Sequence, residues 1–223
     1  MKIPFVLVVL MFTTLQLDAQ VKQYEALVKQ LQGIHNQDQV YRNQLKAVHQ
    51  EFGAESQQMK TLIEKARIAD SLNLVAVEVI LEKYGWLGAE EIGYDGNSTL
   101  FLVIQHSPLE AQTKYLPMMR DAVANGKAEA RSLALLEDRV ALRQGKRQLY
   151  GSQISWDMKT NEYFVLPLED PDNVDQRRAK MGLGTLAEYV SHFNMKWNVE
   201  EYKKELPAIE AKYRATLQQS ERK

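Results

Sequence analysis

The polar side chains best suited to chemistry gather in residues 135–153. Asp138 and Arg139 stand side by side in a segment that is otherwise rich in leucine and valine, and the chain then turns at Gly145. The second half of the stretch adds Gln148, Tyr150 and Gln153. Amide, guanidinium and phenol groups together suit the recognition of a small polar ligand such as a sugar, a peptide or a cell-wall fragment.

A second polar group interrupts the apolar stripes of two predicted helices. Asp38 stands where an apolar residue is due, and Arg42 follows one turn later, where it can pair with Asp38 along the helix face. Asp70 and Asn73 interrupt the stripe of the next helix. If the two helices pack antiparallel, these side chains lie at a similar depth. Two interpretations stay open: a buried polar pair that fixes helix register, or a set of ligand contacts.

Gln105 and His106 end a short predicted helix. A lone histidine at such a junction is most often structural and bonds a nearby backbone carbonyl. The alternative is a general base that is oriented by Asp138 or Asp70, as in a hydrolase. In that case His106 and Asp138 are the candidate catalytic residues.

We expect the polar residues that interrupt apolar segments to converge on one pocket. Each buried polar group that is left without a partner costs about 1–3 kcal/mol, so scattering them singly through the interior is unfavourable. The predicted ligand-binding residues are Asp38, Arg42, Asp70, Asn73, Gln105, His106, Asp138, Arg139, Gln148, Tyr150 and Gln153.

Many signatures of catalysis and metal binding are absent from the sequence. The chain has no cysteine, which excludes thiol nucleophiles, thiolate metal sites and disulfides. It has no HExxH motif, no paired-glycine phosphate loop and no GxSxG motif. A metal site assembled from Asp70, His106 and Asp138 follows no spacing rule. The sequence therefore predicts no metal and no other cofactor, and it leaves open whether the protein is an enzyme.

The spacing of apolar residues predicts a mainly α fold, a bundle-like helical array in one domain with a small β-hairpin. The hairpin is expected at about 148–166, with a turn over 157–161, and it must lie against the helices because an isolated hairpin is marginal in water. Pro207 is expected to interrupt or restart the last helix. Helices are predicted at about 21–52 (bent at Gly33), 56–84, 98–106, 108–125, 127–143, 171–182, 185–195 and from 198 on.

The N-terminus has the pattern of a secretory signal peptide. Lys2 precedes an apolar run over residues 3–15, and Ala19 supplies a small residue at the expected cleavage point. The run is shorter than the roughly 20 residues that span a bilayer, and an uncleaved anchor helix is the alternative. We therefore expect residues 1–19 to be removed and the protein to be exported, periplasmic or secreted, without a membrane anchor.

The remaining chain suits one compact domain over residues 20–217, followed by a frayed tail at 218–223. A formal net charge of -1 gives no electrostatic case for nucleic acid as a partner. A small polar ligand is the expected partner, and the sequence does not determine the oligomeric state.

The sequence resembles an uncharacterised bacterial family, domain of unknown function 6624, between about residues 27 and 189. Leu87 and Ser152 depart mildly from the family, which tends to have proline and threonine there. The resemblance implies a mostly helical domain and transfers no activity. Its residues here are Asp38-Gln39 with Arg42, Asp70 with Asn73, Gly85-Trp86, Gln105-His106 with Gln112, Asp138-Arg139, Gln148-Leu149-Tyr150-Gly151 with Gln153, Asp170-Pro171, Arg177-Arg178 and Gly182-Leu183.

Three functions are compatible with the sequence. The first is a binding module for a small polar ligand, in a pocket between helices. The second is a hydrolase that uses His106 with an aspartate. The third is structural, in which the polar residues form an interhelical hydrogen-bond network that specifies packing.

Overall fold

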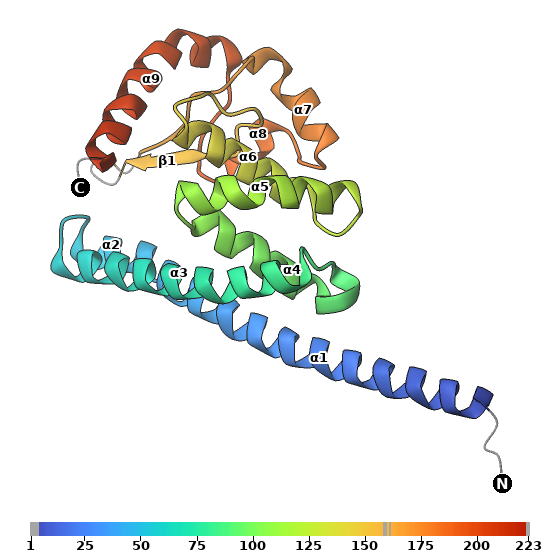
Figure 1. The fold of residues 1–223 in the computed structure, drawn as a ribbon. Coiled ribbons are helices and arrows are strands. Elements are labelled where there is room, and N and C mark those ends of the chain that lie inside the picture. Colours follow the sequence, from blue (N-terminus) through green and yellow to red (C-terminus); the bar gives the residue numbers. More distant parts are fainter. Residues whose placement is uncertain (1–4, 158–159, 161, 222–223) are drawn as a thin grey trace.

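A computed structural model describes residues 5–157, 160 and 162–221, with only the backbone given for 5–21 and 219–221. The described residues form a mainly helical protein with one small antiparallel hairpin, as the sequence predicts (Figure 1). The elements are α1 (Phe5–Arg42), α2 (Leu45–Phe52), α3 (Gln57–Tyr84), α4 (Ala89–His106), α5 (Leu109–Ala124), α6 (Ala130–Arg143), β1 (Ile154–Asp157), β2 (Glu162–Val165), the 3-10 helix η1 (Pro171–Asn173), α7 (Val174–Lys180), α8 (Leu186–Ser191) and α9 (Val199–Glu221).

The first hydrophobic core lies among α1, α3, α4, α5 and α6. Leu31 of α1 and Val77 of α3 are fully buried in it, because the apolar residues of each helix recur every three or four positions and face the neighbouring helix. Figure 1 shows α3 lying along α1, whose N-terminal half extends beyond the rest of the molecule. Because of this packing, Asp38 and Asn73, which interrupt the apolar stripes of α1 and α3, are buried.

The long predicted helix bends at a different place from the one expected. Gly33 lies inside α1, and the break occurs at Asn43 and Gln44, after which α2 packs against α3. A glycine permits a bend but does not impose one, since the apolar stripe continues on both sides of it.

Residues 86–96, expected to be a connector, include the first turns of α4. Gly88 caps this helix, and its backbone N–H donates to the Glu91 carboxylate at 2.8 Å. Gly93 has φ 72°, which kinks α4. The glycine that this kink requires also makes the sequence of the segment look like that of a loop. Asn97, which comes directly before the predicted helix at 98–106, lies inside α4, is buried and donates to the carbonyls of Leu87 and Lys127, both at 2.7 Å.

The hairpin is shorter than predicted. Ile154 pairs with Val165 and Asp157 with Glu162, whereas Gln148 forms only an isolated parallel bridge with Leu168. The predicted turn lies partly outside the described residues. The first strand starts late because Leu149, Tyr150 and Ser152 donate their backbone N–H groups to a side chain, as shown below, and not to a neighbouring strand.

A second hydrophobic core joins β2, α7, α8 and α9, with Leu168, Leu186 and Val190 fully buried. Figure 1 shows this part on the side of α5 and α6 that faces away from α1. Pro207 does not interrupt α9, contrary to expectation. The ring is exposed, so water can solvate the carbonyl that a proline leaves without a helical partner.

Within the described residues, no helix combines the length and the apolar character needed to cross a membrane. The predicted leader includes residues 1–4, which lie outside the described part of the chain, and export stays a prediction.

Candidate functional site

Asp138, at the centre of the polar stretch, is completely buried and binds backbone. Its carboxylate accepts the N–H groups of Leu149 at 2.6 Å, Tyr150 at 3.0 Å and Ser152 at 2.9 Å. Burial raises the pKa of Asp138, and the hydrogen bonds from Ser152, Tyr150 and Leu149 oppose that rise. The contacts show that Asp138 shapes the loop over residues 148–153, which we call the joint loop.

The predicted catalytic pairing of His106 with Asp138 is therefore not the one in the structure. His106 contacts Asp38 instead, at 2.8 Å between Nδ1 and Oδ1. The oxygens of Asp138 are already engaged by backbone N–H groups of the joint loop, which leaves the carboxylate poorly placed to orient an imidazole.

Two further predicted residues hold the joint loop from inside. Gln148 accepts from the Gln153 backbone N–H at 2.8 Å and donates to the Leu166 carbonyl at 2.9 Å. The Tyr150 hydroxyl donates to Glu137 at 3.1 Å, and burial, followed by the charge of Glu137, raises the pKa of Tyr150 to about 12. The polar atoms of both side chains are therefore bonded to groups of the protein itself.

The second core holds the same loop from its other side. The Arg178 guanidinium donates to the Tyr150 carbonyl at 2.8 Å, and the Tyr189 hydroxyl donates to the Ser152 carbonyl at 2.9 Å. Gly151, with φ 65°, sits where an added Cβ would lie 3.1 Å from Leu186. The joint loop thus connects α6 of the first core with α7 and α8 of the second.

A separate cluster forms where α1, α3 and α4 meet, as the packing argument expects for Asp38, Arg42 and Asp70. Arg42 donates from Nη2 to Asp70 at 2.6 Å, and its Nε lies 3.1 Å from His106 Nδ1 and 3.6 Å from Asp38. Burial acts to raise the pKa of Asp38, but the hydrogen bond and charge of His106, together with Arg42, outweigh it and lower the pKa.

The His106 ring nitrogen Nδ1 has two competing partners. Arg42 can only donate to it, which requires a lone pair, whereas Asp38 can accept from it only if it carries a proton. If Nδ1 carries the proton and faces Asp38, then Nε2 has the lone pair of a base. Nε2 makes no hydrogen bond to any described residue, and the side chain is about one-fifth exposed, at 18%.

Asp38, Asp70 and His106 could also hold a metal ion, because their ligand atoms lie within 4.8 Å of one another. This set differs from the one considered from the sequence, which had Asp138 in place of Asp38. Arg42 contacts each of the three and supplies a positive charge among them. The geometry therefore suits the guanidinium, and a metal would have to displace it.

Arg139 has the least satisfied charge in this region. Its guanidinium makes no hydrogen bond or ion pair within the described part of the chain, and Nε is buried. Burial, with the like charges of Arg143 and Arg42, lowers the pKa of Arg139 to about 10. Arg143 is partly engaged, since it donates to the Ser107 carbonyl at 2.8 Å. We call Arg42, Arg139 and Arg143 the arginine group.

Amide side chains border the arginine group. Gln105 and Gln153 both direct Nε2 toward the carbonyl of Leu135, at 3.5 and 3.3 Å, one helical turn before Arg139. Gln105 Oε1 is buried without a partner, and so are both side-chain polar atoms of Asn73, among the described residues. Buried polar atoms of this kind are costly unless water or a ligand binds them.

A cavity of about 480 Å³ opens between the α2–α3 turn, the hairpin and α9. Trp156, Phe164 and Tyr213 contribute aromatic walls. Tyr213 also stands near Arg139 and Arg143, since its charge acts on the pKa of both. Tyr213 is therefore the residue that relates the cavity to Arg139 and Arg143.

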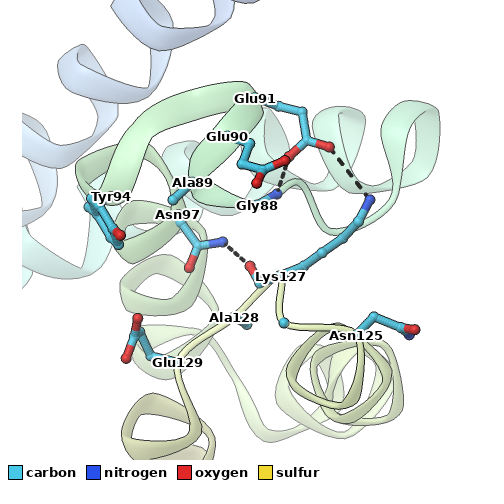
Figure 2. Close-up of a pocket in the computed structure, with 11 residues that line it drawn as sticks. Gly88, Ala89, Glu90, Glu91, Tyr94, Asn97, Asn125, Lys127, Ala128 and Glu129 are labelled. Carbon is cyan, nitrogen blue, oxygen red and sulfur yellow. Dashed lines mark hydrogen bonds and ion pairs between the residues drawn. The ribbon is translucent and has the colours of Figure 1, made fainter.

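A different hollow, of about 320 Å³, lies between the start of α4 and the α5–α6 connection (Figure 2). Its less exposed polar side chains already have partners: Glu91 caps Gly88 and lies 3.6 Å from Lys127, and Asn97 donates to the Lys127 carbonyl. These contacts fix the start of α4, so the hollow offers little free chemistry.

The structure thus divides the predicted site residues. Asp138, Gln148 and Tyr150 bind the joint loop or its neighbours. Asn73 belongs to neither set: its side-chain polar atoms are buried without a partner among the described residues. Sequence reasoning missed Arg143, although its position one turn after Arg139 on α6 is a usable signal, and it missed Tyr189 and Tyr213, which only folding brings near. The residues at or beside the arginine group are Asp38, Arg42, Asp70, Gln105, His106, Arg139 and Gln153.

A family model described as a family of unknown function, domain of unknown function 6624, matches residues 25–200. The chain belongs to this family. The matched segment contains the joint loop and the arginine group, and it ends before Tyr213. The curated proteins and the solved structures give no match to the chain.

Proposed function

We propose that the protein binds a small anionic ligand at the arginine group, in the exported location that the N-terminal sequence favours. The observation that carries the proposal is the Arg139 guanidinium, which has no described partner and a buried Nε. Arg139 is partly buried, and a partly desolvated charge without a counter-ion is unfavourable. Two further arginines nearby increase that cost. A carboxylate or phosphate would remove it by accepting paired hydrogen bonds.

The surroundings support a ligand that is larger than a simple ion. Gln105 offers a buried Oε1 without a described partner, and the neighbouring cavity has walls from Trp156 and Phe164. Apolar and aromatic walls with a few converging polar groups are typical of small-molecule sites. A sugar acid, a sugar phosphate or an acidic peptide fragment has the required combination of charge, polar groups and ring or chain.

The test is a titration of purified protein with inorganic phosphate, citrate and glucuronate at constant ionic strength, followed by thermal shift and calorimetry. We expect at least one of these anions to raise Tm in wild type and to have no effect on Arg139→Met. Without anion, Arg139→Met should match or exceed wild-type stability, by about 1 kcal/mol, since replacing a poorly compensated, partly buried charge with an apolar side chain is often stabilising.

The matched control is Arg131→Met, on the same helix. Arg131 is 66% exposed and lies 3.7 Å from Glu129, so its loss should leave the anion response unchanged. Two outcomes would contradict the proposal: an anion response that persists in Arg139→Met, or a large loss of stability in that variant without any anion response in wild type. The second outcome would favour the structural interpretation.

A hydrolase is the second candidate, and the contact of His106 with Asp38 at 2.8 Å favours it. In this function His106 Nε2 acts as the base, and Asp38 holds the ring in the required tautomer. Turnover of aryl phosphate or ester substrates that is lost in both His106→Ala and Asp38→Asn would support it. Anion binding without such turnover would leave the protein a binding module.

A further inference from the structure

The outer face of α3 has an apolar stripe that no described element of the chain covers. Ile68, Leu72, Val75 and Val79 are 50%, 64%, 63% and 60% exposed. Their spacing of four, three and four residues aligns them over three helical turns, opposite the buried face that carries Met59, Val77 and Ile80. A helix that is apolar on two faces indicates a second packing partner.

The pattern of the stripe is complementary to itself when one copy is reversed. In an antiparallel pair centred between residues 73 and 74, Leu72 faces Val75 of the other copy, and Ile68 faces Val79. The same register sets Lys65 against Glu82 at both ends of the stripe. These positions follow the alternating three- and four-residue spacing of a helical seam, in which antiparallel layers pair such positions.

The charged residues at the two ends of the stripe indicate that its partner is a second copy of the chain. Lys65 and Glu82 are opposite in sign and equally distant from the centre, so a second copy satisfies both at once. Both are exposed, and Glu82 makes a contact of 3.3 Å to Lys114 of its own chain through one carboxylate oxygen. The other oxygen stays available to a lysine of the second copy.

We propose that two copies of the protein associate through antiparallel packing of their α3 helices along Ile68, Leu72, Val75 and Val79. The contact is isologous, since the same surface is used by both copies. Four aliphatic side chains per copy make a small interface, so we expect a weak dimer with micromolar affinity. Asp70 bonds Arg42 of α1 on the inner side of α3, so neither residue belongs to the proposed interface.

Charge exchange tests both the partner and the register. Lys65→Glu and Glu82→Lys each set like charges against each other at both ends, and each should weaken dimerisation by at least about tenfold in sedimentation equilibrium. The double variant restores opposite charges and should recover the wild-type dissociation constant. Lys60→Glu makes the same charge change on α3 away from the stripe and should have no effect.

The absence of cysteine from the chain allows a geometric test. In the antiparallel register, protein with Ile68→Cys forms a disulfide on mixing with protein that carries Val79→Cys, and neither variant cross-links to itself. Self-linking of Ile68→Cys would show a parallel pair and overturn the register. A wild-type protein that stays monomeric through the sub-millimolar range, or a double charge variant that fails to recover association, would overturn the proposal.

Discussion

At the scale of single residues, the buried polar groups have two distinct roles. Asp138 binds three backbone N–H groups and gives the joint loop its shape, whereas Arg139, the next residue along α6, has no described partner. Adjacent helical positions point about 100° apart, so neighbours in sequence face different environments. The Asp138–Arg139 pair therefore combines a structural residue with a candidate binding residue.

Asp38 should make the protein sensitive to acid. The pKa of Asp38 is lower in the folded protein than in the unfolded chain. Its contribution to stability is therefore fully present above the pKa of the unfolded chain, and it is lost as pH falls through the pKa of the folded protein. We expect the free energy of unfolding to decline below about pH 4. Asp38→Asn should be about 2 kcal/mol less stable at pH 7 and should show a shallower acid decline, measured by urea unfolding from pH 7 to 2.

Glu64→Gln is the control for this experiment. Glu64 also has a lowered pKa, caused by Arg67, but it is exposed, and solvent screens the interaction. Its pH profile should follow that of wild type. An acid decline of wild-type steepness in Asp38→Asn would show that another carboxylate is responsible.

At the scale of elements, the short first strand follows from competition for backbone groups. The alternation from residue 148 onward predicts a strand, and a buried carboxylate from another helix instead binds the N–H groups that a strand would donate. Gly151 reinforces this, since its φ of 65° is unfavourable for residues with a Cβ. The joint loop is thus an irregular element that tertiary contacts define.

Two glycine substitutions separate backbone strain from packing. Gly145 and Gly151 both have positive φ, but an added Cβ at Gly145 meets nothing within 4 Å, whereas at Gly151 it lies 3.1 Å from Leu186. Gly145→Ala should cost about 1 kcal/mol, and Gly151→Ala about 1–3 kcal/mol more, because the second core must also shift. Equal losses in chemical denaturation would show that Leu186 relaxes freely.

At the scale of the whole molecule, the joint loop connects two hydrophobic cores. Asp138 holds it from α6, and Arg178 and Tyr189 hold it from α7 and α8. Ligand sites often lie where two packed units meet, and the arginine group is at this junction. Whether the two cores unfold as one domain, as the sequence predicts, can be measured.

The tryptophans report on the cores separately. Trp86 is in the first core, whereas Trp156 lies in the hairpin and Trp197 packs on the second core. Trp86→Phe leaves the fluorescence of Trp156 and Trp197, whereas the double variant Trp156→Phe/Trp197→Phe leaves that of Trp86. In urea we expect the fluorescence midpoint of each variant to coincide with the midpoint of its own circular dichroism transition. Adding Asp138→Ala should separate the fluorescence transitions, with the second core unfolding first. Separate transitions without that change would show two independent domains.

The sequence by itself determined most helices, the hairpin and the polar residues that break the apolar stripes. Helices are specified by local periodicity, so α3, α5 and α6 begin and end within about three residues of the predicted bounds. Only the tertiary structure decided which polar groups meet. His106 pairs with Asp38 and not Asp138, and Tyr213 reaches the arginine group from α9, because side chains far apart in sequence become neighbours through packing, which no local spacing encodes.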